Sequence, residues 1–219
     1  MTGRLPVLAA TLALGLAASS AAQISPGSSG FPGIRSASQE EYWFSMRELG
    51  RCLVSFKHAQ SIQWMKTPVD SPAEKKLVDA MYASKGTSCL RDMYSMGVIR
   101  STVRGSVAEA LYKTSGLQGA VPPAPASHPF DSINIKSLGD FALCYAVTHP
   151  NEIRTLLMTT GLGSVAEKAE MARLSPGFAE CVPAGIELKL SPQPLRAAFA
   201  EAMYHVTNDA STPAVAGIR

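Results

Sequence analysis

An internal repeat constrains this chain more than any other sequence feature. Residues 104–112 read RGSVAEALY and residues 196–204 read RAAFAEAMY, and the two stretches are 92 positions apart. The matched positions are Arg104, Ala108, Glu109, Ala110 and Tyr112 in the first motif and Arg196, Ala200, Glu201, Ala202 and Tyr204 in the second. A motif that returns at a fixed offset indicates two copies of one structural unit.

The four cysteines follow the same offset. Cys52 falls on Cys144 and Cys89 on Cys181, so each half carries a pair 37 positions apart. Four cysteines allow three pairings. If each half is a copy of one unit, only Cys52–Cys89 with Cys144–Cys181 keeps each unit self-contained. Structural zinc sites usually take two ligands from a close pair, and this spacing has none, so we interpret the cysteines as disulfides.

The N-terminus has the features of a secretory signal peptide. Arg4 precedes an apolar run over 5–18, and small residues follow up to Ala22, where we predict cleavage. No later stretch approaches the ~20 apolar residues that a membrane span needs, so no transmembrane anchor is expected after cleavage. An even number of cysteines fits an oxidising compartment, and we predict a periplasmic or secreted protein.

The periodicity of the remaining sequence predicts an all-α fold. We expect two tandem four-helix-like units, each with one disulfide inside the unit, joined by a Pro-rich linker. The predicted divisions are a signal peptide at 1–22, a disordered lead-in at 23–37, unit 1 at 38–114, the linker at 115–136, unit 2 at 137–207 and a disordered tail at 208–219.

Helix starts are marked by serine caps. Ser38 with Glu41 forms a capping box before an apolar stripe in steps of three and four, and Ser137 caps the corresponding helix of the second copy. Short second helices are predicted over 60–66 and 151–159. The third helices are predicted to open with the capping boxes Ser71–Glu74 and Ser164–Glu167, and residues 186–190 alternate like an extended segment.

The motif helix closes each unit. At ~100° per residue, Arg104, Ala108 and Tyr112 form a row beside the apolar stripe, where the alanine would let another helix come close. Glu109 falls on the opposite side of this helix, so we expect Glu109 and Glu201 to face water. As surface groups they should tolerate replacement by Gln within about 0.5 kcal/mol.

The motif residues have two possible roles. They could present a charged and phenolic row to a ligand or partner, or they could pack the fold. Duplication favours packing, because a fold determinant must be present in every copy.

No recognised catalytic or cofactor motif occurs in the chain. It has neither H-E-x-x-H nor G-x-S-x-G, and its four histidines share no repeat position. No catalytic residue, metal ligand or cofactor is therefore predicted. The formal net charge is +3 without a dense basic cluster, which argues against nucleic-acid binding.

The cysteine spacing together with R-x-x-x-A-E-A-[LM]-Y resembles a family of uncharacterised exported proteins of Gram-negative bacteria. The resemblance covers about residues 45–114 and 137–206. Ala197 departs from the family pattern, which has Gly there. The resemblance implies a compartment and a helical fold and carries no known activity.

These features favour an exported non-catalytic protein that binds an unknown protein partner or supports the cell envelope. The alternative is a periplasmic hydrolase with a carboxylate-based site in the groove between the two units. A cleft holding two carboxylates, or a histidine–carboxylate pair outside the repeat motif, would favour that alternative.

Overall fold

A computed structural model of the chain describes residues 38–83, 89, 100–116, 135–182 and 190–208. Across these ranges the chain forms eight α helices and no strand, as the sequence predicts. Both predicted disulfides are present, Cys52–Cys89 and Cys144–Cys181. The predictions for the signal peptide, lead-in, most of the linker, residues 186–189 and the tail lie outside the described residues.

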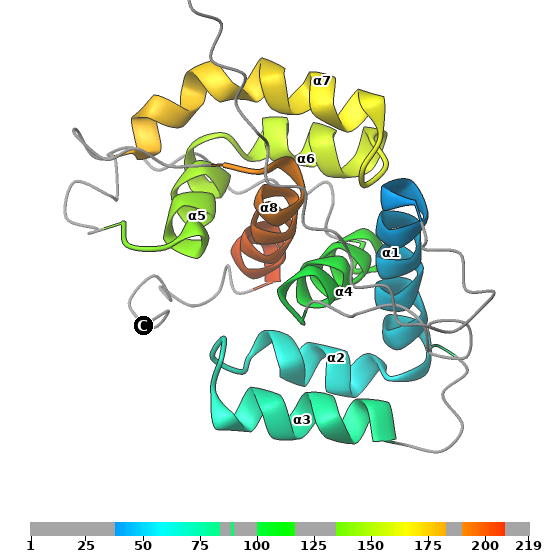
Figure 1. Cartoon of the computed structure of the whole chain (residues 1–219). Coiled ribbons are helices and arrows are strands. Elements are labelled where there is room, and N and C mark those ends of the chain that lie inside the picture. The colour runs from blue at the N-terminus through cyan, green and yellow to red at the C-terminus, as the bar shows by residue number, and fades with distance from the viewer. Residues whose placement is uncertain (1–37, 84–88, 90–99, 117–134, 183–189, 209–219) are drawn as a thin grey trace, which may run out of the picture. The chain divides into compact units, whose positions relative to one another are not determined.

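Within these ranges the first half consists of four helices, and the last of them, α4, is the motif helix. They are α1 (Gln39–Phe56), α2 (His58–Met65), α3 (Pro72–Ala83) and α4 (Arg100–Thr114). Helix α4 contacts α1 and α2, and α2 pairs with α3 (Figure 1). The second helix begins two residues before the predicted start.

The second half repeats this order. Its helices are α5 (Leu138–Thr148), α6 (Pro150–Thr159), α7 (Val165–Leu174), the 3₁₀ helix η3 (Ser175–Cys181) and α8 (Pro192–Asn208). Helix α8 packs on α5 and α6, as α4 packs on α1 and α2. The correspondence of contacts supports the repeat that the sequence shows.

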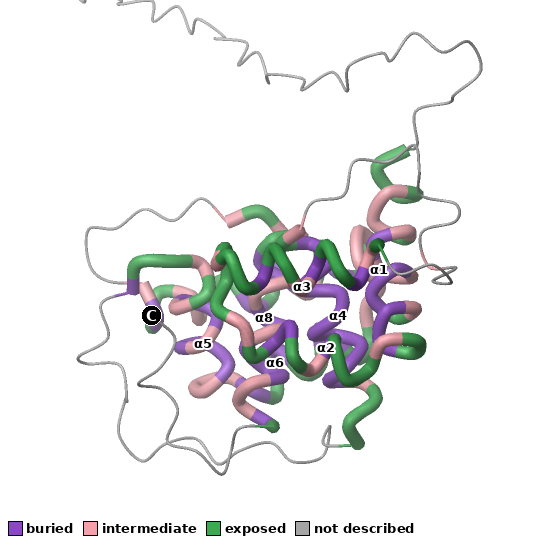
Figure 2. Tube along the Cα trace, turned by 90° about the horizontal axis from the view of Figure 1, so that it is seen from below, coloured by how far each residue is buried: buried purple, intermediate pink, exposed green. Residues whose placement is uncertain are grey.

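The two motif helices, α4 and α8, pack against each other at the centre (Figure 1). In α4 every residue from Thr102 to Tyr112 is buried, and Figure 2 shows both helices largely buried while α3 is mostly exposed. All described helices fall within one compact unit, Ala37–Arg219. The two halves therefore share one interior along the α4–α8 contact.

Two glycines set the distance between α4 and its neighbours. A Cβ placed on Gly105 would lie 2.3 Å from the Cβ of Ala197 in α8. A Cβ on Gly50 in α1 would lie 2.5 Å from the backbone carbonyl carbon of Ser106. Because both obstructing groups are fixed to a helix backbone, any larger residue would push the helices apart.

Helix starts follow the predicted caps. The Ser38 hydroxyl accepts from the amide of Glu41, whose carboxylate accepts from the Ser38 amide in return. Ser137 forms the same reciprocal box with Asp140. The apolar stripe predicted after Ser38 consists of Tyr42, Met46, Leu49, Leu53 and Phe56. Its three middle residues are buried, but Phe56 is 65% exposed at the end of α1.

Ala108 and Ala200 are fully buried, as expected for residues beside a helix contact. Replacing either with Leu is expected to overpack the site and lower the free energy of unfolding by about 1–3 kcal/mol. The matched control is Ala80→Leu on the exposed face of α3, which should change it by less than about 0.5 kcal/mol. Urea unfolding measures all three, and equal effects at Ala80 and Ala108 would contradict the packing role.

Candidate functional site

The motif residues meet where α4 crosses α8. Arg196 donates from Nε and Nη2 to the two carboxylate oxygens of Glu109, at 2.8 Å each. Its Nη1 also lies 3.4 Å from Oε1 of Glu167. The side chains of Arg196 and Glu167 are 1% and 0% exposed, so Arg196 is buried between two glutamates.

Arg104 forms the corresponding cluster from the other side. It donates from Nη2 to Glu201 at 2.7 Å and from Nη1 to Glu74 at 2.9 Å. Arg104 and Glu74 are 3% and 1% exposed, whereas Glu201 keeps 23% of its side-chain surface. The second cluster is therefore similar in composition but closer to solvent.

Backbone carbonyls complete both clusters at repeat positions. Arg104 donates to the carbonyl oxygens of Trp64 and Met65 at the end of α2. Arg196 donates to those of Leu156 and Leu157, which lie 92 positions later in α6. All N–H groups of both guanidinium ions thus have acceptors inside the protein. Each arginine links the second helix and the third helix of its own half to the motif helix of the other half.

The expected exposure of the motif glutamates is wrong. The side chain of Glu109 is 8% exposed and pairs with Arg196, and Glu201 is only partly exposed and pairs with Arg104. The side of the helix expected to face water is covered by the other motif helix. Tyr112 and Tyr204 are also buried, so all eight motif residues except the partly exposed Glu201 lie in the interior.

The glutamates that begin α3 and α7 complete the site, and sequence reasoning assigned them to capping boxes. Ser71 and Ser164 do accept from the amides of Glu74 and Glu167. In return, the Glu74 and Glu167 carboxylates accept from the backbone amides of Asp70 and Gly163, each one residue before the capping serine.

Asp70 and Gly163 occupy corresponding turn positions. They share a positive φ, 58° and 78°, which directs their amides towards the glutamates. The sequence did indicate that Glu74 and Glu167 correspond, because the Ser71–Glu74 capping motif recurs as Ser164–Glu167 at nearly the offset of the repeat.

The electrostatics of the two clusters follow from burial and pairing. Burial raises the pKa of Glu109, but the hydrogen bonds and the charge of Arg196 lower it by more. The pKa of Glu109 therefore lies below its usual range. Glu201 behaves likewise, with His205 and Arg104 outweighing burial. For Glu167 burial prevails over Arg196, and the pKa is raised.

These shifts predict a loss of stability in acid. Glu109 and Glu201 have depressed pKa values in the folded state, so the unfolded chain takes up their protons first as the pH falls below about 4.3. Their stabilisation is present above that pH and is lost as the pH approaches their folded pKa values. Glu167, with a raised pKa, acts in the opposite direction.

Urea unfolding of the parent from pH 7 to pH 3 should show a falling free energy of unfolding below about pH 4.3. A Glu109→Gln/Glu201→Gln variant should show a shallower dependence, since both groups have been removed. A parent whose stability is constant between pH 5 and pH 3 would contradict the assignment.

One shallow open pocket lies beside the Arg104 cluster. Its lining is Val69, Asp70, Glu74, Arg100, Ser101 and Arg104. It holds the carboxylates of Asp70 and Glu74. The oxygens of Glu74 already accept hydrogen bonds from Trp64, Asp70 and Arg104. Asp70 is largely exposed and lies 3.9 Å from Arg100. The pocket therefore offers no pair of uncommitted carboxylates for acid–base chemistry.

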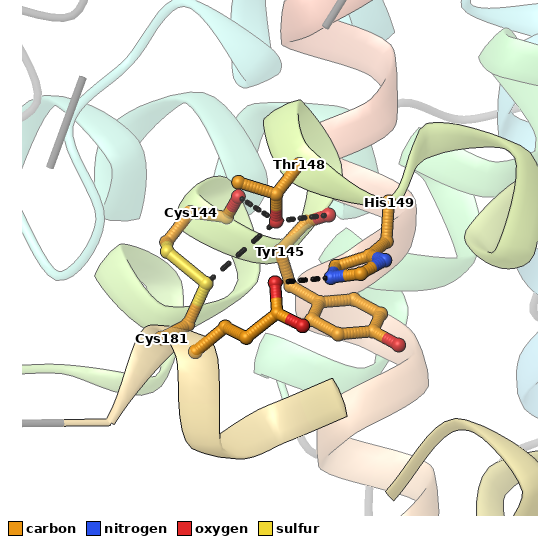
Figure 3. Close-up of a disulfide and its surroundings, with 6 residues drawn as sticks. Cys144, Tyr145, Thr148, His149 and Cys181 are labelled. Carbon is orange, nitrogen blue, oxygen red and sulfur yellow. Dashed lines mark hydrogen bonds and ion pairs between the residues drawn. A yellow bond between two sulfur atoms is a disulfide. The ribbon is translucent and has the colours of Figure 1, made fainter. Parts of the chain in front are cut away.

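A histidine–carboxylate pair lies beside the second disulfide (Figure 3). His149 Nε2 is 2.9 Å from Glu180, and its ring stacks on Tyr145 with centroids 4.5 Å apart. The nearby Thr148 hydroxyl donates to the carbonyl of Cys144, within its own helix. The Tyr145 hydroxyl donates to the carbonyl of Leu174, and burial raises the pKa of this phenol to about 12. Both hydroxyls are thus engaged with backbone carbonyls, so neither is poised as a nucleophile activated by His149.

Within the described ranges no group of three or more His, Cys, Asp or Glu side chains has the arrangement of a metal site. None of the helices described is both long and apolar enough to cross a membrane. No protein-family model, curated protein or solved structure matches the chain.

Proposed function

We propose that this chain is an exported, non-catalytic helical protein of the cell envelope that binds another protein or stabilises a complex. The observation that carries this proposal is the commitment of the motif charges. Arg104, Arg196 and their four glutamates pair with one another within the fold. The charged residues of the repeat motif therefore stabilise the structure. Function then belongs to the outer surface.

The architecture proposed for this role is a tandem pair of four-helix units. Each disulfide joins two residues of one half, and each half has the same order of helices. Residues 115–136 supply the Pro-rich linker between them. Disulfide-closed helical units suit the oxidising, protease-containing space outside the inner membrane.

Export supports the same proposal. The charged, apolar and small-residue segments over 1–22 have the order of a signal peptide. The resemblance to exported proteins of Gram-negative bacteria points to the periplasm or the exterior of such a cell.

The test places a photo-crosslinking amino acid at exposed positions on four helices of the full chain, expressed from Met1 in a Gram-negative host. Suitable positions are Phe44, Lys76, Met158 and Lys168. A specific partner should crosslink from positions on one face and not from the others, and the protein should be found in the periplasmic or secreted fraction. The non-reacting positions serve as internal controls against random contact.

The hydrolase alternative makes a different prediction. The purified protein would cleave an ester, peptide or glycoside substrate, and Asp70→Asn in the open pocket would abolish that activity with the fold intact. Such an activity, combined with no face-specific crosslink, would overturn the proposal.

A further inference from the structure

The α4–α8 contact has the symmetry of a contact between two copies of one unit. Arg104 of the first motif pairs with Glu201 of the second, and Arg196 of the second pairs with Glu109 of the first. These are the same two repeat positions, exchanged. In an isologous interface residue i contacts residue j and residue j contacts residue i, and this interface meets that description within one chain.

The pseudo-two-fold axis of this contact passes between Gly105 and Ala197. These residues occupy the same repeat position, and a residue can meet its own equivalent only near such an axis. A Cβ on Gly105 would lie 2.3 Å from the Cβ of Ala197 and 2.5 Å from its Cα. The crossing therefore accommodates one Cβ at the axis and excludes two.

We propose that the face of α4 formed by Arg104, Gly105, Ala108 and Glu109 fits the same face of a second copy of this chain, whereas the α8 face does not fit itself. Two α4 helices would exchange Arg104 with Glu109 in both directions and would place Gly105 against Gly105 without a Cβ conflict. Two α8 helices would place Ala197 against Ala197, with the two Cβ atoms too close. The proposal concerns a second copy and is independent of the envelope partner proposed above.

In the parent chain α8 covers this face of α4. The two halves are parts of one polypeptide, so the intramolecular contact has the advantage of a high effective concentration. The parent should accordingly be monomeric through this interface. A second copy should occupy the α4 face once α8 is prevented from doing so.

The test uses three variants of the full chain and measures mass in solution by light scattering. Ala197→Trp blocks the α8 face, leaves α4 unchanged and should double the mass relative to the parent. Gly105→Trp carries the same bulky residue on the α4 side, leaves only α8 faces to pair and should stay monomeric. Ala197→Trp/Gly105→Ala should also stay monomeric, because two alanines would meet at the α4–α4 axis.

This pattern distinguishes pairing of two α4 faces from non-specific association through apolar surface that the substitutions expose. Dimers from both tryptophan variants, a dimer that survives Gly105→Ala, or a monomeric Ala197→Trp with the circular dichroism of the parent would each overturn it.

A second measurement decides the matter if Ala197→Trp loses its helical signal. Gly105→Ala should lower the melting temperature of the full chain, and Gly105→Ala/Ala197→Gly should recover it in large part, because one Cβ again lies at the axis. A double variant that melts no higher than Gly105→Ala would show that the axis is not where the proposal places it.

Discussion

Replacing Arg196 with Ala is expected to lower the free energy of unfolding by about 3–5 kcal/mol, which is the usual cost of removing one partner from a buried charge cluster. The loss removes the buried cation beside Glu109 and Glu167, whose side chains are 8% and 0% exposed, and leaves Glu109 with Lys113 as its cationic partner. It also removes one donor from each of the carbonyls of Leu156, Leu157 and Thr160. Chemical unfolding at pH 7 measures the effect.

The repeat supplies a matched comparison in Arg104→Ala. This change also removes two carboxylate partners, but it frees two backbone carbonyls instead of three. In addition, Glu201 is 23% exposed and can be solvated once Arg104 is gone. We therefore expect Arg104→Ala to be destabilising but less so than Arg196→Ala. Arg173→Ala is the surface control, because Arg173 is 55% exposed and pairs with Glu170 three positions earlier in its own helix. Its cost should stay below about 1 kcal/mol.

The result would contradict the structure if Arg196→Ala cost no more than Arg173→Ala. A double-mutant cycle with Glu109→Gln separates the pairwise coupling from the loss of packing. Because Glu109 is buried and bonded to both Arg196 and Lys113, Glu109→Gln should by itself cost more than the 0.5 kcal/mol or less expected of a surface glutamate.

The sequence predicted local features and repeat-related features of this fold well. Caps such as Ser38 and Ser137 depend on residues three positions away, so a short window contains all that is needed. The disulfide pairing was predictable because the repeat removes two of three possibilities.

The exposure of Glu109 could not be predicted in the same way. Its partner Arg196 lies 87 positions away. A helix with one apolar stripe is normally covered on that side alone, whereas α4 is covered on every side from Thr102 to Tyr112. Polar residues on a fully buried helix look like surface residues until their partners are placed. Here the duplicated Arg and Glu were the available clue, because residues that recur together can pair with each other across the copies.

Removing the second disulfide by Cys144→Ala/Cys181→Ala is expected to lower the free energy of unfolding by roughly 4 kcal/mol. The two disulfides close loops of equal length, each with a sequence separation of 37, so the chain-entropy contribution is the same for both. Any difference between the two deletions must therefore come from the folded state.

Burial provides that difference. Cys144 and Cys181 are 0% and 2% exposed, while Cys52 and Cys89 are only partly buried. Deleting the sulfur atoms of the second bridge opens a void in a packed region beside Phe141 and Tyr145, whereas water can fill the space left by the first. We expect the second deletion to cost about 1 kcal/mol more than Cys52→Ala/Cys89→Ala.

Urea midpoints and slopes of the two double variants test this comparison under identical conditions. Equal slopes would show that the denatured states are equally compact, as equal loop lengths require. A larger loss of unfolding free energy from the first deletion than from the second would contradict the argument. The loops are equally long, so the less buried bridge would then contribute more to stability. Reducing agent should lower the stability of the parent towards that of a variant lacking both bridges. It should act on the partly exposed Cys52–Cys89 bond first, since a reductant must reach a sulfur atom in order to attack it.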